Sequence, residues 1–207
     1  MIILLDTSHN LDDAEKEVGL KCEQLLTPLT RRRRQREHES FAIDNGAFSK
    51  SGFDAKAFES LLQREFEDRK LCRFVTVPDV VGSARRTSEV FDYWFSRLSH
   101  WKLAFVCQDG QEDLPIPFEF IDAVFIGGST KWKESSHAVA CVRAARAIGK
   151  WSHIGRINSP DRFEAFDQIG ADSCDGTGLA QYSLMREKVR TRNGEHRLFP
   201  TSEMVSI

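Results

Sequence analysis

Short apolar runs that end in Asp, Gln or Gly recur along the chain and alternate with amphipathic segments. A run of about four to eight apolar residues between turn-forming residues predicts a buried strand. The clearest example, Ala171-Asp-Ser-Cys-Asp-Gly-Thr-Gly178, carries an aspartate to the end of a predicted strand. Seven predicted strands cover residues 2–5, 41–45, 73–80, 102–107, 123–126, 152–157 and 171–175.

The segments between these strands carry the apolar spacing and capping residues of helices. Asp54 can cap a helix, and Phe53 can pack against Phe58 as a hydrophobic staple. Residues 133–148 predict a second, Ala-rich helix, and the charged residues 11–25 predict an exposed helix or an ordered insertion. The alternation of strands and helices indicates βα units and a parallel sheet.

Length and composition set the size of the fold. The chain has 207 residues, of which 41% are hydrophobic and 29% are charged, which suits one soluble globular domain. A (β/α)8 TIM-type barrel usually has roughly 250 residues and rarely fewer than about 200. We therefore predict an α/β fold over residues 1–207, either a minimal or incomplete (β/α)8 TIM-barrel-like domain or an open doubly wound sheet.

The formal net charge is −2, so any binding of nucleic acid must come from local basic patches. Two such patches occur, in residues 31–37 and in the C-terminal residues 181–207. Each can be a solvated face or a phosphate-binding surface, and two patches on a slightly acidic chain favour phosphate contact. The arginines of the first patch are Arg31, Arg32, Arg33, Arg34 and Arg36.

Five widely spaced cysteines include no C-x-x-C pair, which predicts neither a disulfide framework nor a metal site. No apolar run approaches the roughly 20 residues needed to span a bilayer, and the first residues lack the features of a signal peptide. We therefore expect a cytoplasmic protein without a membrane segment. Cys174, His137 and His153 are expected to be packed or surface residues, with a place in the site as the alternative for His153.

Polar residues and glycines follow the predicted strands at the ends where parallel α/β folds bind ligands. They are Asp44, Asp79, Gln108, Gly127, Gly128 and Asp175. Carboxylates and an amide can read the edge of a planar ligand such as a purine, and glycines let the backbone approach it. Phe48, which follows the Asp44 turn, could stack on the ring. Each aspartate alone could be an ordinary turn residue, but their convergence favours a site.

Neighbouring carboxylates shift each other's pKa values apart. One can then stay ionised as a nucleophile while another holds a proton. Such a pair suits chemistry at the anomeric carbon of a sugar, where the transition state resembles an oxocarbenium ion. We expect Asp175 to be the reactive carboxylate.

These segments resemble, in order and spacing, the motifs of the tRNA-guanine transglycosylase family. Ile43-Asp-Asn-Gly-Ala-Phe48 is similar to its Asp-Ser-Gly-Gly-Phe/Tyr motif, and Ala171-Asp-Ser-Cys-Asp175 is similar to its Asp-x-Phe-Asp-Cys motif. Four further segments resemble its base-recognition and loop motifs: Pro78-Asp79, Val106-Cys-Gln-Asp-Gly110, Phe125-Ile-Gly-Gly-Ser129, and His153-Ile-Gly-Arg156 with Asp161-Arg-Phe-Glu-Ala165. The resemblance covers residues 41–178.

The resemblance implies a base-exchanging N-glycosyl transferase, which replaces guanine in nucleic acid with a 7-deazaguanine such as 7-cyano-7-deazaguanine. It implies that Asp175 is the covalent nucleophile and that Asp44 is the acid or base. The other residues of the set would bind the base: Asp79, Gln108, Gly127, Gly128 and Phe48. No cofactor is implied.

The chain departs from the family in lacking its Cys-x-Cys-x-x-Cys and His zinc site, together with the subdomain around it, and Ala47 replaces a glycine. It is in this respect closer to the short relatives in phages and genomic islands that act on DNA. The resemblance therefore implies a zinc-free enzyme with DNA as the favoured polymer and tRNA as the alternative. It also implies a cytoplasmic location, in the host if phage-encoded, and leaves room for a homodimer or an accessory protein.

Two other functions remain open at the same site. An N-glycosyl hydrolase on nucleosides or nucleic acid would use water in place of the incoming base. A non-catalytic module would use the basic patches to hold nucleic acid.

Overall fold

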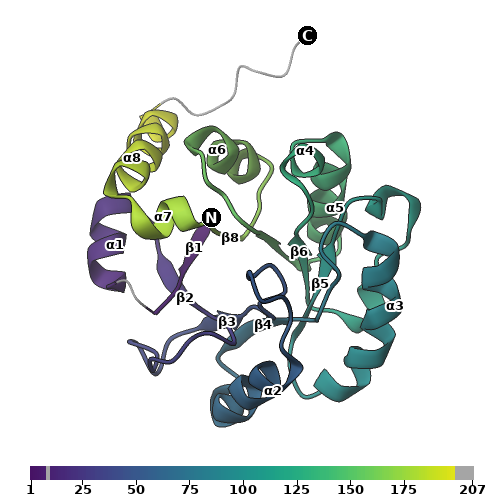
Figure 1. Cartoon of the computed structure of the whole chain (residues 1–207). Coiled ribbons are helices and arrows are strands. Elements are labelled where there is room, and N and C mark those ends of the chain that lie inside the picture. The colour runs from purple at the N-terminus through teal and green to yellow at the C-terminus, as the bar shows by residue number, and fades with distance from the viewer. Residues whose placement is uncertain (8–9, 199–207) are drawn as a thin grey trace.

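Eight parallel strands close into a barrel in the computed structural model of this chain, and helices surround it (Figure 1). Each strand pairs with the next along the chain, and the last pairs with the first. The structure describes residues 1–7 and 10–198, with side chains as far as residue 191. The predicted α/β barrel is therefore confirmed, and its ring is closed rather than incomplete or open. The strands are β1 (Ile2–Leu5), β2 (Cys22–Leu26), β3 (Phe41–Ile43), β4 (Cys72–Thr76), β5 (Leu103–Cys107), β6 (Ala123–Ile126), β7 (Trp151–Ile154) and β8 (Ser173–Asp175).

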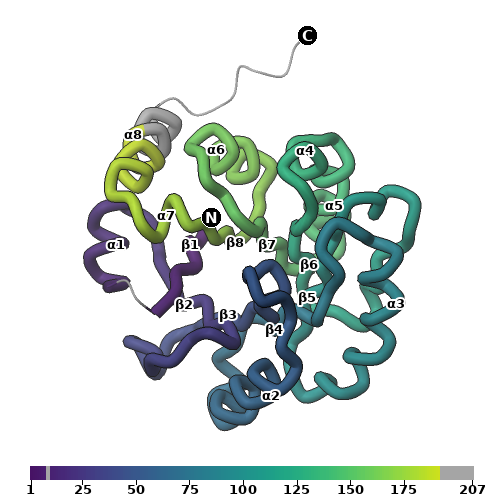
Figure 2. The backbone as a smooth tube through the Cα atoms, in the orientation of Figure 1, coloured from purple at the N-terminus to yellow at the C-terminus, as the bar shows by residue number. Residues whose placement is uncertain are grey.

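The helices cover the outside of the barrel, and α8 lies beside α1 (Figure 2). They are α1 (Leu11–Val18), α2 (Ala55–Arg64), α3 (Ala84–Phe95), α4 (Thr130–Lys133), α5 (Ser136–Ala147), α6 (Pro160–Gln168), α7 (Thr177–Gln181) and α8 (Ser183–Leu198), with single 3-10 turns at Phe66–Asp68, Ser96–Leu98, Gln111–Asp113 and Phe118–Phe120. As predicted, Asp54 caps α2 by accepting from the backbone N–H of Ala57 at 3.0 Å. The Phe53 and Phe58 rings pack edge to face with centroids 5.7 Å apart. The helix predicted at 133–148 is present as α5, and its first predicted residue, Lys133, instead ends α4.

The eighth strand, β2, lies in a segment whose sequence predicts a helix or an insertion. Only the first part of residues 11–25 is helical, and β2 pairs with β1 and β3. Glu23 and Gln24 interrupt its apolar pattern, although both residues are only 2% exposed. Glu23 accepts from Nη2 of Arg73 at 2.6 Å, and the Arg73 guanidinium lies over the ring of Trp151. An ion pair with a buried carboxylate thus takes the place of apolar contacts inside this end of the barrel. For this reason β2 lacks the apolar run by which a buried strand is recognised in a sequence.

Apolar side chains from alternate strand positions fill the barrel interior. Small and large residues interdigitate there: Leu4, Leu25, Ala42, Phe74, Ala104, Val106, Ala123 and Phe125. A second, larger apolar cluster lies between the strands and the helices. The barrel interior is therefore a packed core and not a channel.

Residues 27–40, all described by the structure, connect β2 to β3 without a helix. Ion pairs hold this connection against its neighbours. Arg34 is buried, and its Nε donates to Glu65 at 3.1 Å. Arg36 donates to Glu15 of α1 through both terminal nitrogens at 3.0 Å. Two arginines of the run therefore form ion pairs within the fold and hold the β2–β3 connection in place.

Three other predictions from the sequence can be compared with the structure. Cys174 is fully buried in β8, as predicted for a packed residue. Among the described helices, none combines the length and the apolarity needed to cross a bilayer. Of the predicted basic segment 181–207, α8 covers the part up to residue 198, and residues 199–207 lie outside the described part of the chain. In that helix Arg186 donates to Glu17 of α1 at 2.6 Å.

Candidate active site

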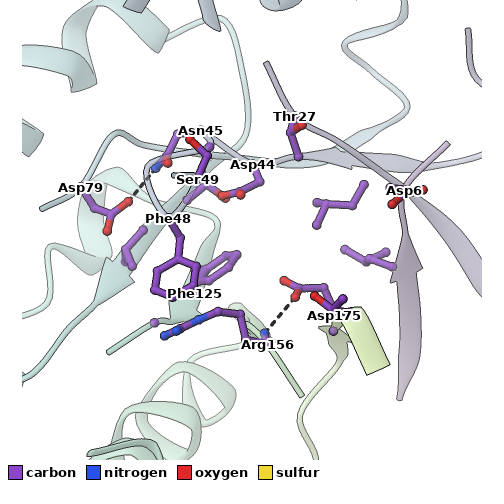
Figure 3. A pocket seen from close by; sticks show the side chains of 18 of the residues that line it. Asp6, Thr27, Asp44, Asn45, Phe48, Ser49, Asp79, Phe125, Arg156 and Asp175 are labelled. Atoms are coloured by element: carbon purple, nitrogen blue, oxygen red, sulfur yellow. Dashed lines mark hydrogen bonds between the residues drawn. The ribbon is translucent and has the colours of Figure 1, made fainter. Parts of the chain in front are cut away.

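A cavity of about 360 Å³ opens at the C-terminal end of the barrel, where parallel barrels hold their ligands. Six of the seven residues predicted to react with or bind a substrate line it: Asp44, Phe48, Asp79, Gln108, Gly127 and Asp175. Asp44 directly follows β3, and Asp175 is the last residue of β8. Figure 3 shows both carboxylates in this one pocket, with Arg156 and Phe48 beside them. The topology thus brings together residues that are far apart in the sequence.

Asp175 is held at both carboxylate oxygens. Its Oδ1 accepts from the backbone N–H of Arg156 at 2.8 Å (Figure 3), and its Oδ2 lies 3.1 Å from Nε2 of His153. The side chain is 18% exposed, so it still faces the cavity. A Cβ at Gly176 would lie 1.9 Å from the carbonyl oxygen of Ile157. Glycine is therefore required for β8 to leave the barrel this close to the β7 loop.

His153 supports Asp175 from inside the barrel. Its ring is completely buried and lies between the rings of Phe74 and Phe125, with centroids 5.2 and 4.6 Å away. Its Nδ1 lies 2.9 Å from the hydroxyl of Ser173, which accepts from Nε1 of Trp151 at 2.8 Å. The predicted satisfied histidine is confirmed, and its partner is the predicted nucleophile.

Asp44 and Asp79 are carboxyls whose pKa values are raised in the site. Burial, followed by the charges of Asp175 and Asp79, raises the pKa of Asp44 to about 7. Burial also raises the pKa of Asp79, against the hydrogen bonds from Asn45 at 2.8 Å and Gln108 at 2.6 Å. The site can therefore hold an ionised Asp175 opposite a carboxyl that gains and loses a proton near neutral pH.

Gln108 has its polar atoms engaged within the protein. Its Oε1 accepts from the backbone N–H groups of Gly82 and Gly128, both at 2.9 Å, and its Nε2 donates to Asp79. The residue is 2% exposed. The amide thereby ties three loops to one another and orients Asp79, while the predicted direct contact with a base stays a prediction.

The two glycines after β6 differ from their predicted role. The N–H of Gly127 donates to Cys107 at 3.0 Å, and that of Gly128 donates to Gln108. The carbonyl of Gly128 accepts from Arg156. A Cβ at Gly127 would lie 2.8 Å from Val106, and Gly128 has a φ of 66°. Their lack of side chains serves internal packing and backbone geometry, and both N–H groups are already bound.

Arg156 is the main site residue that the sequence pattern misses. It lines the cavity, has a φ of 60°, which is uncommon outside glycine, and places its guanidinium 3.7 Å from the centre of the Phe48 ring. Phe48 is 58% exposed, and the loop between β3 and α2 lies over the end of the barrel (Figure 1). The pair provides a cationic and an aromatic surface across the mouth.

Lys133 stabilises the loop that follows β7 and carries Arg156. It is 1% exposed, and its ammonium donates to the carbonyl oxygen of Gly155 at 2.6 Å. Burial, followed by the charge of Arg156, lowers its pKa to about 8. Since Gly155 directly precedes Arg156, this bond helps to fix the backbone N–H that binds Asp175.

The five arginines predicted to bind nucleic acid divide into two groups. Arg31, Arg32 and Arg33 are exposed. Arg34 and Arg36 form the internal ion pairs of the β2–β3 connection. The structure thus corrects the predicted patch, because pairing with carboxylates within the fold occupies two of its five cations.

Within residues 1–7 and 10–191, no three His, Cys, Asp or Glu side chains form a group that could hold a metal ion. The three site aspartates engage backbone N–H groups, amides and an imidazole instead. Carboxylates held in this way can act as nucleophiles, acids or bases.

Comparison with known proteins shows similarity in fold. No protein-family model and no curated protein matches the sequence. A solved structure of the BexX/CysO complex from Amycolatopsis orientalis has a chain with a TM-score of 0.59 and 13% identity, covering 99% of this chain and 93% of that one. A 3-hexulose-6-phosphate synthase has a TM-score of 0.49 and 13% identity, covering 92% and 99%. At such identities the first match supports the barrel fold alone.

Proposed function

We propose that this protein is an enzyme that exchanges a purine base in nucleic acid by breaking and re-forming the N-glycosidic bond. The proposal takes guanine as the leaving base, a 7-deazaguanine as the incoming base, and DNA as the favoured polymer. One observation carries it: Asp175 and Asp44 share one cavity, and the pKa of Asp44 is raised to about 7. Such a pair supplies a nucleophile and a proton carrier together.

In the first half-reaction an oxygen of Asp175 bonds to C1′ while the C1′–N9 bond breaks. The electron pair goes to N9 of guanine, which takes the proton of Asp44. Asp175 accepts one hydrogen bond at each oxygen, so lone pairs remain for the attack. In the second half-reaction Asp44 removes the N9 proton of the incoming base. N9 then bonds to C1′ as the bond to Asp175 breaks, which restores the carboxylate.

The surrounding residues supply recognition in this proposal. A volume of about 360 Å³ lies within the range of pockets that enclose small ligands. Asp79 can accept from the N–H groups on a guanine edge. The exposed ring of Phe48 and the guanidinium of Arg156 offer surfaces on which a base can stack.

The test is incorporation of radiolabelled guanine and 7-cyano-7-deazaguanine into DNA and into tRNA by purified protein. We expect label in DNA with the natural sequence and with Asp92→Asn, an equivalent change on the exposed face of α3. We expect no label with Asp175→Asn. Full exchange by Asp175→Asn would overturn the assignment of the nucleophile, and label in tRNA alone would replace the polymer but keep the chemistry.

Hydrolysis of the same bond is a second candidate. The observation that favours it is the internal pairing of Arg34 and Arg36, which leaves fewer cations for a polymer. Water would then attack C1′ in place of the incoming base. Chromatography for free guanine released from nucleosides and from DNA distinguishes this reaction. Retention of DNA with neither label nor free base would indicate a binding module.

A further inference from the structure

A small turn at the rim of the cavity carries a feature that the proposed chemistry does not use. Residues 27–30 form this turn, in which the N–H of Thr30 donates to the carbonyl oxygen of Thr27 at 2.8 Å. The Thr30 hydroxyl accepts from the N–H of Thr27 at 2.9 Å, and the Thr27 hydroxyl accepts from the N–H of Leu29 at 3.2 Å. Arg64 of α2 donates to the Thr30 carbonyl oxygen at 3.0 Å. The turn is therefore built without help from any ligand.

This turn presents Leu29 to solvent at the edge of the cavity. Leu29 is 67% exposed, more than any other large apolar side chain that the structure describes, and it lines the pocket. A single exposed leucine is ordinary on a protein surface. The position of Leu29 is unusual, because an ordered turn places it in the lining of the cavity that holds the carboxylates. Three exposed arginines, Arg31 to Arg33, begin two residues further along the chain.

We propose that Leu29 is a wedge that enters a nucleic-acid duplex and fills the space of the base extruded into the cavity. This inference rests on the proposed function, and it identifies the substrate as double-stranded rather than single-stranded nucleic acid. A base inside a duplex cannot reach Asp175 unless it leaves the stack, and proteins that unstack bases commonly insert apolar side chains between them. The arginines that follow Leu29 bind the phosphates that flank the opened step.

The turn is also coupled to the reacting loop. A Cβ at Gly46 would lie 3.0 Å from Cδ of Pro28, so the proline of the turn packs directly on the backbone that follows Asp44. Val81, a second exposed apolar residue of the rim, follows β4 and is followed by two exposed arginines, Arg85 and Arg86, in the first turn of α3, but no proline beside it packs on the loop after Asp44. These relationships single out Leu29 among the apolar residues around the mouth.

The test compares Leu29→Ala with the natural sequence on two DNA substrates, a full duplex and the same target guanines in an unpaired bubble. Loss of the wedge lowers base exchange or base release on the duplex by about tenfold or more and on the bubble by less than about twofold. Leu29→Met, which keeps an apolar side chain of similar size, retains activity on the duplex. Leu184→Ala removes another exposed leucine, which is 60% exposed on α8 and does not line the cavity, and serves as the control.

A binding readout keeps the inference separate from the proposed chemistry. Duplexes with 2-aminopurine beside each guanine become fluorescent when a neighbouring base leaves the stack. We expect the natural sequence and Leu184→Ala to raise this fluorescence and Leu29→Ala to raise it much less. If the natural protein shows this signal but neither exchange nor base release, the proposed function fails and the wedge stands. Equal losses on duplex and bubble, or equal fluorescence with and without Leu29, would overturn the wedge.

Discussion

Nε2 of His153 lies 3.1 Å from Oδ2 of Asp175, and the histidine is fully buried inside the barrel. An ionised carboxylate only accepts hydrogen bonds, so Nε2 donates to it. Behind the ring, Ser173 and Trp151 continue the hydrogen bonding toward the other end of the barrel. The orientation of Asp175 is therefore set from within the fold before any substrate arrives.

His153→Gln tests this positioning role. We expect kcat for base exchange to fall about 10- to 100-fold, as for other residues that orient a reacting group, while KM stays within about threefold. His137→Gln, an exposed change on α5, is the control. Steady-state kinetics below the unfolding temperature of both variants provide the measurement. A raised KM with unchanged kcat would instead place His153 in substrate binding.

Asp44 gives the stability of the fold a specific pH dependence. Its pKa is about 7 in the folded chain and 3.8 as the unperturbed reference. Between these values the unfolded chain loses a proton that the folded chain keeps, so the free energy of unfolding falls as pH rises and levels off above pH 7. Asp44→Asn removes this term, which is up to about 4 kcal/mol. Urea unfolding should show the variant gaining stability relative to the natural sequence from pH 4 to pH 8; a constant difference would contradict the assignment.

Gly176 and Gly178 form a matched pair on either side of Thr177. A Cβ at Gly176 would lie 1.9 Å from the backbone of Ile157, whereas at Gly178 the nearest atom would be 3.5 Å away. We expect Gly176→Ala to lower the free energy of unfolding by about 1–3 kcal/mol and to displace Asp175, with a large loss of activity. Gly178→Ala should be close to neutral. Thermal unfolding and the exchange assay measure both variants, and equal behaviour would argue against this packing.

Arg34 and Arg33 are adjacent in sequence but differ in burial. The Arg34 side chain is 4% exposed and pairs with Glu65, whose side chain is 9% exposed, whereas Arg33 is exposed. Arg34→Gln removes one of the two arginine partners of the buried Glu65, which keeps its ion pair with Arg64 at 2.8 Å, and we expect a loss of about 1–3 kcal/mol in urea unfolding. Arg33→Gln should change stability by less than about 0.5 kcal/mol and weaken DNA binding instead. A weak effect of Arg34→Gln on stability would return it to the proposed DNA contacts.

The sequence predicts seven of the eight strands because each lies in a short, mainly apolar segment that turn-forming residues follow. It does not predict β2, since Glu23 finds its charge partner, Arg73, 50 residues further along the chain. A pattern of hydrophobic residues reveals a buried strand only where the buried side chains are apolar. A buried ion pair therefore conceals a strand from it.

The residues of the site are likewise predicted only in part. The strand-end rule places Asp44, Asp79 and Asp175 correctly in one cavity, because closure of the barrel brings these ends together whatever the detailed geometry. The rule says nothing about hydrogen-bond partners, so it cannot show that Gln108 is engaged internally. The strand-end rule does not identify Arg156, because its left-handed backbone depends on contacts that form only in the complete fold.

The connection from β2 to β3 gives the barrel wall an uneven response to ionic strength. Elsewhere apolar helix faces cover the strands, and salt hardly weakens such contacts. Over β2 and β3 guanidinium–carboxylate pairs form part of the cover, and the exposed ones among them are screened by salt. We therefore expect added salt to loosen this sector, so that the backbone amides of β2 and β3 exchange with deuterium before those of β6 and β7. Because β3 delivers Asp44 to the cavity, the buffer acts on the shape of the reacting centre as well as on contacts with a charged polymer.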